Sequence, residues 1–283
     1  MNPFEPVGAA QSPPVVEPIE RLDDPRVADY THVGDPGWLQ SHDLFVAEGR
    51  LVVRRLLEER RFSVRSVLIT PTAYAALADV MPGLTVPAYV CDQQALAALT
   101  GFHFHRGCLA LASRGRAAVP LESLLETPLI VGLEGVGNPD NVGGIFRNAL
   151  AFGAGGVMLD PSSGDPLYRK AIRTSMGAAL RVPFARLDDW PAGLQRFRAA
   201  GFTIVALTPA VDAIDIHAFA QSRPPGPLML LAGHEGHGLS EAAVAVSDVR
   251  CRIPIDPRSD SLNVAVATGI ALAMLTTDHT RRS

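Results

Sequence analysis

Lysine, cysteine and long apolar runs are all scarce in this sequence of 283 residues. Lys170 is the only lysine and no G-x-x-x-x-G-K-[ST] motif occurs, which excludes a P-loop nucleotide site. The three cysteines, Cys91, Cys108 and Cys251, lack C-x-x-C spacing and indicate neither a disulfide framework nor a zinc site. A reducing, cytoplasmic compartment is therefore expected.

Segments that would direct the chain to a membrane are also missing. The longest apolar run, residues 264–275, is shorter than the about 20 residues that cross a bilayer, and no basic segment followed by an apolar run opens the chain. The formal charge of −4 argues against a uniformly basic nucleic-acid-binding surface. Arginines nevertheless cluster in three segments, which are either solvated helix faces or a local basic surface.

Composition and hydrophobic spacing divide the chain into four parts. Residues 1–20 are rich in proline and poor in packing residues, so a disordered or loosely docked tail is expected. Residues 21–118 mix helical and strand patterns, which predicts a small α/β domain. A polar connector, residues 119–127, then leads to residues 128–283, where strands and helices alternate.

In the small domain, residues 45–61 have helical spacing, with Val52 and Leu56 on one side and arginines largely on the other. The remaining expected elements of this domain are strands at 64–70 and 107–113 and helices at 72–80 and 93–99.

In the C-terminal part, strands separated by helices predict a parallel sheet covered on both faces. The expected strands are 129–134, 156–160, 203–208, 228–233 and 250–255, and the expected helices begin at 141, 167, 240 and 261. Ligands of such sheets bind outside the carboxyl ends of the strands. Three strand ends carry unusual polar residues.

The first is "NPDNVGGIFRNAL", residues 138–150. The glycines in and before this stretch, Gly132, Gly135, Gly137, Gly143 and Gly144, do not fall in the register of the dinucleotide fingerprint G-x-G-x-x-G. Arg147, close to the start of an apolar helix, places a positive charge near the positive end of the helix dipole. Such a local conflict is typical of functional sites.

The second and third strand ends are "GHEGHGLS", residues 233–240, and "IPIDPRSDSLN", residues 253–263. Ser240 is interpreted as a helix cap. Asn263, expected two residues inside a helix, is unfavourable there unless its amide has a partner. No metal site is expected, because His234 and His237 do not have H-E-x-x-H spacing, and His103 and His105 lack a third ligand nearby in sequence.

Together these residues resemble the three motifs of the SpoU (TrmH-like) ribose methyltransferases of the SPOUT superfamily, in order and spacing. The resemblance covers about residues 126–280. "YRKAIRTSMGAAL", residues 168–180, is similar to the stretch between the first two motifs, and residues 40–115 more weakly resemble the ribosomal-protein-like RNA-binding domain that often precedes the catalytic one.

The resemblance implies methyl transfer from S-adenosylmethionine to a ribose 2′-hydroxyl of structured RNA, by a homodimer whose C-terminal chain forms a deep trefoil knot. Ribosomal RNA is favoured and transfer RNA stays open. The implied active-site residues are Asn141, Arg147, Glu235, Ser261 and Asn263. The implied cofactor-binding residues are Leu207, Thr208, Gly233, His234, Glu235, Gly236, Ile253, Ile255, Ser261 and Leu262.

Two points depart from or extend the family pattern. Pro257 stands where the family usually has glycine, so the adenosine-facing loop is expected to be shaped differently. Arg147 either accepts the hydroxyl proton or, because guanidinium stays protonated, acts by position and charge. Candidate RNA-binding residues are Arg50, Arg54, Arg106 and Arg173.

Two other readings compete with the ribose methyltransferase. One is a non-catalytic RNA-binding or assembly protein on the same fold. The presence of the implied active-site residues argues against it: Arg147, Glu235, Ser261 and Asn263. The other is a different nucleotide enzyme on an ordinary doubly wound sheet, against which the missing dinucleotide fingerprint speaks.

Overall fold

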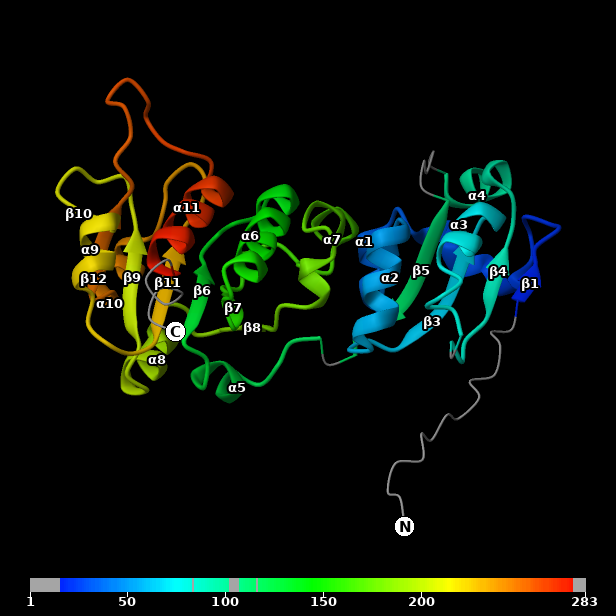
Figure 1. The fold of residues 1–283 in the computed structure, drawn as a ribbon, viewed down its shortest axis with the longest axis horizontal. Helices are drawn as coiled ribbons and strands as arrows, with labels where there is room; N and C mark the ends of the chain where they lie inside the picture. The colour runs from blue at the N-terminus through cyan, green and yellow to red at the C-terminus, as the bar shows by residue number, and fades with distance from the viewer. Residues whose placement is uncertain (1–15, 83, 102–106, 116, 277–283) are drawn as a thin grey trace, which may run out of the picture. The chain divides into compact units, whose positions relative to one another are not determined.

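The computed structural model describes residues 16–82, 84–101, 107–115 and 117–276. The chain divides into two units, residues 1–115 and 116–283, and the division falls shortly before the predicted connector (Figure 1).

The first unit is built on a five-stranded mixed sheet in the order β1-β4-β3-β5-β2. β1 and β3 pair with β4 in parallel, and β5 pairs antiparallel with both β3 and β2. The strands are β1 Val16–Pro18, β2 Leu44–Glu48, β3 Val64–Ile69, β4 Ala88–Val90 and β5 Cys108–Ser113.

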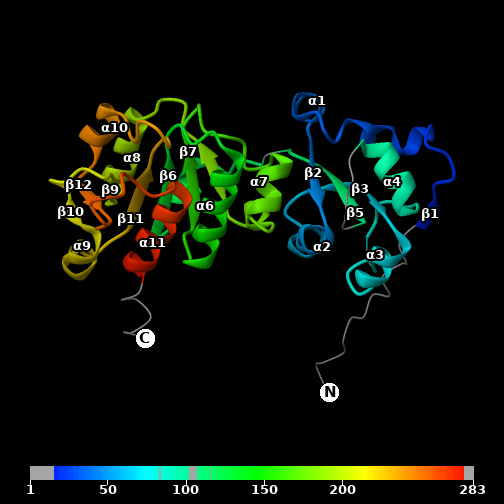
Figure 2. The same ribbon diagram turned by 90° about the horizontal axis from the view of Figure 1, so that it is seen from above.

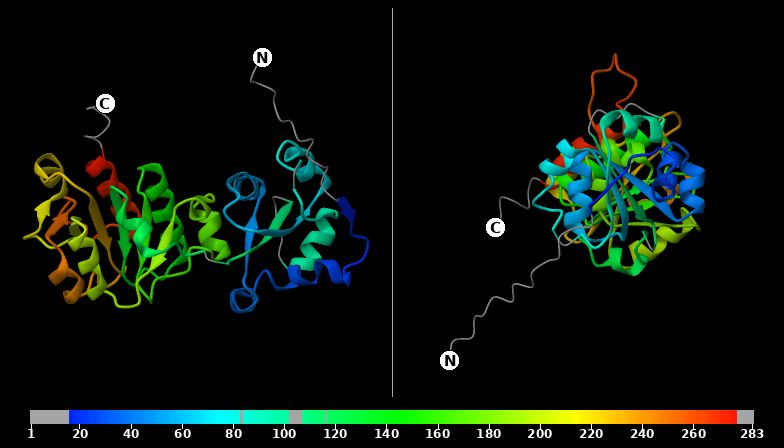
Figure 3. Two further views of the ribbon diagram at one scale, coloured as in Figure 1. Left: turned by 90° about the horizontal axis from the view of Figure 1, so that it is seen from below. Right: turned by 90° about the vertical axis from the view of Figure 1, so that its right-hand side faces the viewer.

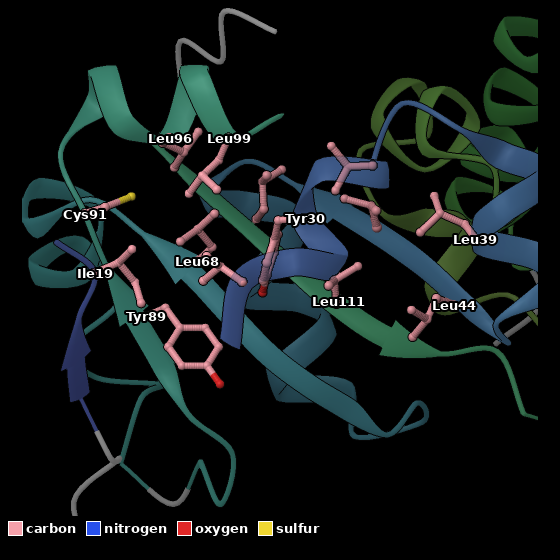
Figure 4. Packing of buried hydrophobic residues seen from close by; sticks show 14 residues of the cluster. Ile19, Tyr30, Leu39, Leu44, Leu68, Tyr89, Cys91, Leu96, Leu99 and Leu111 are labelled. Carbon is pink, nitrogen blue, oxygen red and sulfur yellow. The ribbon is translucent and has the colours of Figure 1, made fainter. Parts of the chain in front are cut away.

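Helices pack on this sheet and enclose an apolar core. Its α-helices are α1 Pro36–Ser41, α2 Arg50–Glu59, α3 Pro71–Ala76 and α4 Gln93–Thr100, and a 3-10 helix, η1, spans Pro25–His32. Figure 4 shows Tyr30 of η1 among side chains of the sheet and of α4, and Tyr30 and Leu96 are fully buried. The first unit thus has a mixed α/β architecture.

Two expectations for this unit need correction. Residues 45–61 are not one helix, because residues 44–48 are buried on both faces as strand β2 and the chain turns at Gly49, whose φ is +90°. Only α2 is helical, and in it Val52 and Leu56 are buried as expected. The predicted tail also contributes structure, since β1 adds a parallel strand to β4.

The second unit is built on a seven-stranded sheet in the order β10-β12-β9-β11-β6-β7-β8, and every pair in it is parallel. This confirms the predicted parallel-sheet fold. The strands are β6 Leu129–Leu133, β7 Gly156–Leu159, β8 Phe184–Arg186, β9 Thr203–Leu207, β10 Ile214–Asp215, β11 Leu228–Ala232 and β12 Val249–Arg252.

Helices cover both faces of this sheet (Figures 2 and 3). Its main helices are α5 Leu121–Leu125, α6 Pro139–Ala151, α7 Arg169–Thr174, α8 Gln195–Ala199, α9 Ile216–Ser222, α10 Glu241–Val246 and α11 Val264–Thr276. α8 and α10 lie on one face, whereas α6, α11 and α9 lie together on the other (Figure 2). None of the helices in the described ranges combines the length and apolar character needed to cross a membrane.

Several elements differ from expectation. The connector contains α5, whose Leu124 is buried against the sheet. β8, β10, α8 and α9 were not expected, because these short segments give little periodic signal. The helix expected from 261 begins at Val264, and the helix expected near 167–178 is only α7 followed by turns and a short 3-10 helix, η2 Ala178–Leu180.

α6 approaches its neighbours closely because it carries Gly143 and Gly144. A Cβ added to Gly143 would lie 2.6 Å from the Ala171 carbonyl oxygen of α7, and one added to Gly144 would lie 2.9 Å from the Ala265 Cβ of α11. α6 is therefore held between α7 and α11, with its first turn at the carboxyl edge of the sheet.

Gly143→Ala is expected to destabilise the protein. Overpacking against the α7 backbone costs roughly 1–3 kcal/mol, which outweighs the about 1 kcal/mol gained in helix propensity. Urea unfolding measures the loss. Gly137→Ala is the control, because its added Cβ meets nothing within 4 Å, and equal stability of the two variants would contradict the close packing.

Candidate functional site

The unusual polar residues converge at the carboxyl edge of the second unit's sheet. Because β12, β9, β11 and β6 are neighbours and parallel, the segments that follow them leave the sheet at the same edge. These segments are residues 208–213, 233–240 and 253–263, together with residues 134–138 before α6 (Figure 1).

Three side chains, one from each predicted motif, form a continuous hydrogen-bond chain. The Asn141 amide Nδ2 donates to Glu235 Oε1 at 2.6 Å, and the Asn263 amide Nδ2 donates to Asn141 Oδ1 at 2.8 Å. These contacts join residues 94 and 122 positions apart in sequence. The structure thus brings together Asn141, Glu235 and Asn263, as the resemblance implied.

The chain has a fixed polarity. An ionised carboxylate only accepts hydrogen bonds, so Glu235 requires the NH₂ group of Asn141 to face it. The Asn141 oxygen is then left for the NH₂ group of Asn263, and the Asn263 oxygen points to α11. There it accepts from the backbone N–H groups of Ala265 and Val266 at 3.0 and 3.2 Å.

Asn263 therefore does not lie inside a helix, which corrects the expectation. It precedes α11 and its oxygen satisfies two of the unpaired N–H groups at the start of that helix, the ordinary role of a helix cap. Asn263 conflicts with helix preferences only if the helix is taken to begin at residue 261. Its amide nitrogen, in contrast, has the partner that the sequence argument required.

Arg147 is exposed, and none of the described residues gives its side chain a hydrogen bond or ion pair. It follows Asn141 by six residues, which places it roughly 120° away around the helix. Neither Asn141 nor Asn263 hydrogen-bonds Arg147, because the two amides bind each other and Glu235. Arg147 instead points away from the core.

Asn148, rather than Arg147, faces α11. Seven residues after Asn141, it returns to nearly the same side of α6, and its Nδ2 donates to the Ala265 carbonyl oxygen at 2.7 Å. Gly269 leaves room for it, since a Cβ there would lie 2.8 Å from Asn148 Nδ2. Asn141 and Asn148 together fix α11 against α6.

Asp160, which is 5% exposed, fixes the segment before α6 by hydrogen bonds. The Asp160 carboxylate accepts hydrogen bonds from the backbone N–H groups of Gly135 and Ser163 and from the Ser162 hydroxyl. Burial raises the pKa of Asp160, but these hydrogen bonds outweigh it and the pKa is lowered overall. An ionised Asp160 therefore fixes the turn that delivers Asn141.

α7 presents basic side chains beside the start of α6. Lys170 Nζ lies 2.7 Å from Asp140 Oδ2, the Thr174 hydroxyl donates to Asp140 Oδ1 at 2.9 Å, and Arg173 is exposed on the same helix. The Lys170 ammonium holds the pKa of the Asp140 carboxyl below its ordinary value.

The residues predicted to bind a cofactor line the same edge. Four aliphatic side chains there are half-buried rather than packed into the core: Leu207, Ile253, Ile255 and Leu262. The Thr208 N–H donates to the Cys251 carbonyl oxygen at 2.9 Å and ties the end of β9 to β12. Ser261 is exposed, as is Pro257 in the turn of residues 257–258.

The loop of residues 233–240 closes on itself. His234 and Gly238 exchange backbone hydrogen bonds of 3.1 and 2.9 Å, Gly236 N–H donates to His234 Nδ1 at 2.8 Å, and the rings of His234 and His237 stack with centroids 3.9 Å apart. Ser240 caps α10 by accepting from the Ala243 N–H at 3.1 Å, which confirms its interpretation as a cap.

No group of three or more potential metal ligands occurs within the described ranges. His103 and His105 lie outside those residues.

The candidate RNA-binding arginines of the first unit differ in their surroundings. Arg50 is exposed at the start of α2, whereas Arg54 binds the Asp79 carboxylate at 2.6 and 2.8 Å and the Ala76 carbonyl oxygen. Arg106 lies outside the described residues. Arg54 is thus committed to an ion pair within the unit.

Comparison with known proteins gives one consistent family. The SpoU rRNA methylase family matches residues 128–273. A protein of Mycobacterium tuberculosis, named an uncharacterized tRNA/rRNA methyltransferase, is 38% identical over 253 residues, which cover 88% of each chain.

Solved structures agree with that family in fold. An AdoMet-bound rRNA methyltransferase from Sinorhizobium meliloti superposes with a TM-score of 0.77 at 26% identity, covering 93% of this chain and 98% of that one. The SpoU methyltransferase AviRb from Streptomyces viridochromogenes, in complex with AdoMet, has the same fold, with a TM-score of 0.74 at 21% identity over 91% and 98% of the chains.

Asn263→Asp separates the two functions of Asn263. The carboxylate still caps α11 but has no donor for Asn141 Oδ1, so a stability loss of about 1 kcal/mol is expected from the missing hydrogen bond. Asn263→Ala loses the cap as well, at about 1 kcal/mol more. Urea unfolding of both variants checks the order, and an Asn263→Asp variant as stable as the wild type would contradict the hydrogen-bond chain.

Proposed function

The chain belongs to the SpoU rRNA methylase family, and from that premise we propose that it transfers the methyl group of S-adenosylmethionine to a ribose 2′-hydroxyl of RNA. The observation that carries the proposal is the polarised chain Glu235–Asn141–Asn263, which links all three motifs at the carboxyl edge, with the exposed Arg147 on the same helix as Asn141.

The residues at this edge suit an adenosine with a charged sulfonium. The half-buried Leu207, Ile253, Ile255 and Leu262 offer apolar surface for a base, and residues 233–236 offer backbone groups beside the Glu235 carboxylate. S-adenosylmethionine, when bound, supplies a methyl group activated by the positive sulfur. Glu235 is already turned toward Asn141, so its charge is fixed in position beforehand.

The side chains mainly have to position the acceptor. The 2′-oxygen must form a bond to the methyl carbon as the carbon–sulfur bond breaks, while the hydroxyl proton leaves. In-line positioning of this kind supplies much of the acceleration in such reactions. An arginine guanidinium stays protonated in proteins, so in this proposal Arg147 binds the ribose or its phosphate and stabilises the developing oxyanion, and the proton leaves through phosphate or water.

Structured RNA is the proposed acceptor, with ribosomal RNA favoured because a small α/β unit precedes the methyltransferase unit. Arg147, Arg173 and Lys170 are all basic residues of the neighbouring helices α6 and α7, where phosphate contacts would give salt-dependent affinity. Arg50 is a further candidate on the first unit. Arg54 is a weaker one, because binding RNA would require it to leave Asp79.

The proposal includes the trefoil knot of the superfamily. The strand order supports it, because β11 and β12 are inserted between strands formed earlier in the chain: β11 between β6 and β9, and β12 between β9 and β10. The last helix, α11, then packs on α6, α9 and β11.

The proposal also includes a homodimer formed through α11. This helix contains no charged residue, yet only one side of it faces the core. Val266 is 51% exposed, and Ile270 and Ala273, four and seven residues later, lie on the same outward side. A helix that is apolar all round is ordinarily buried, and a second copy of the chain would bury this stripe next to Arg147.

Val266→Asp is expected to shift the protein from dimer to monomer, because a carboxylate in an apolar interface is left without a partner. Sedimentation velocity measures the change. Val211→Asp is the matched control, since Val211 is 89% exposed outside this helix. A wild type that sediments as a monomer, or a Val266→Asp variant that remains a dimer, would contradict the proposed interface.

Arg147→Ala is expected to bind S-adenosylmethionine with near-normal affinity and to lose methyl transfer by at least about 100-fold, the scale of one lost oxyanion-stabilising donor. Transfer of tritium from the labelled donor to ribosomal RNA measures the rate, and nuclease digestion with mass spectrometry identifies the methylated position.

The control is Arg196→Ala, an exposed arginine of α8 that pairs with Asp189. Near-normal turnover by Arg147→Ala would refute the role of Arg147, and a methyl group found on a base would refute the ribose specificity.

A further inference from the structure

Glu134 lies where the first and second motifs meet but belongs to neither of the residue sets described above. It directly follows β6, and its N–H donates to the Ala232 carbonyl oxygen of β11 at 3.0 Å, extending the pairing of the two strands by one residue. Its carboxylate is consequently next to the loop of residues 233–240 that follows β11.

The Glu134 carboxylate accepts three hydrogen bonds. Ser240 gives two of them, from its backbone N–H to Oε2 at 2.8 Å and from its hydroxyl to Oε1 at 2.7 Å. Trp190 Nε1 gives the third, to Oε1 at 2.9 Å. All three partners are donors, so the arrangement suits an ionised carboxylate, which only accepts.

This contact fixes one end of the loop, and Glu235 fixes its outer part. Within the loop, a Cβ on Gly233 would lie 2.3 to 2.5 Å from the backbone of Gly238 and Leu239, so the two arms of the loop are already pressed together. The loop is therefore attached to the β6–α6 segment at two points: Ser240 to Glu134, and Glu235 to Asn141.

We propose that Glu134 is a positioning residue that holds the loop of residues 233–240 in the shape that receives the methyl donor. It acts through Ser240 and Trp190 and touches neither the donor nor the RNA. This inference rests on the proposed function, because it assigns that loop to S-adenosylmethionine. In metal sites, residues that orient a ligating group in this way typically change affinity about 10- to 100-fold when altered.

Glu134→Gln tests the proposal with almost no change of shape. The glutamine oxygen can still accept from Trp190 Nε1 and the Ser240 hydroxyl, but its NH₂ group then faces the Ser240 N–H, where two donors meet. Glu241→Gln is the matched control, because Glu241 is an exposed carboxylate one residue beyond Ser240.

The full-length protein is titrated with S-adenosylmethionine by calorimetry, and tritium transfer to ribosomal RNA gives kcat and KM for the donor. For Glu134→Gln we expect Kd and donor KM to rise about tenfold, with kcat at saturating donor within about twofold of the wild type. Glu241→Gln is expected to match the wild type throughout. Unchanged Kd, or a fall in kcat alone, would overturn the positioning role.

Two further measurements keep the outcome decisive. If Glu134→Gln does not fold, Ser240→Gly tests the same contact. This substitution removes the hydroxyl group that donates to Glu134, and replacing a serine cap by glycine costs only a few tenths of a kcal/mol. A Kd for S-adenosylmethionine equal to that of the wild type would then overturn the proposal.

The fluorescence of Trp190 gives a second measurement. In a Trp38→Phe background, Trp190 is the only tryptophan. Its emission in the absence of S-adenosylmethionine should differ between Glu134→Gln and the wild type, since the acceptor of the indole N–H changes from a carboxylate to a neutral amide oxygen; identical emission would contradict the contact.

The wild-type titration separates the two levels of inference. A wild type that fails to bind S-adenosylmethionine would contradict the proposed function itself. A wild type that binds it, together with an unaltered Glu134→Gln variant, would overturn only the role of Glu134.

Discussion

The hydrogen bond from Asn141 to Glu235 is the contact on which the site depends. Because the Glu235 carboxylate accepts from the Asn141 amide nitrogen, it determines which way the Asn141 amide faces, and Asn141 in turn determines the orientation of Asn263. Asn263 then caps α11, so one charge orders three segments that are far apart in sequence. Asn141 is 7% exposed, so its amide would be costly to leave unpaired, whereas Glu235 and Asn263 are exposed and supply its two partners from the other two motifs.

The surrounding structure supports that contact with small residues and further carboxylates. Glycines let α6 approach both α7 and α11, and Asn148 adds a second bond between α6 and α11 beyond the site. Asp160 fixes the turn before α6, and Glu134 fixes the exit of the loop after β11. The edge of the sheet is thus organised before any ligand arrives, which is the condition under which positioning accelerates a reaction.

The sequence predicted the parts of this arrangement that have local signals. The strands of the parallel sheet are apolar runs of ordinary length, and β6, β7, β9 and β11 fall within a residue of their expected bounds. β8, β10 and α9 are short and lack periodicity. The start of α11 was misplaced because Ser261 also resembles a cap, and only the bonds to Ala265 and Val266 assign that role to Asn263.

The contacts of the site likewise divide into those that local sequence patterns indicate and those that they do not. Asn141, Glu235 and Asn263 stood out because their motifs are recognisable, whereas Glu134 and Asn148 depend on partners 106 and 117 residues away that no local pattern indicates. The most direct measurement is a crystal structure with S-adenosylmethionine bound. The account predicts the donor against residues 233–240 and 253–263, with its methyl group open toward the Arg147 side of α6. A donor bound elsewhere, or a methyl group facing away from Arg147, would contradict it.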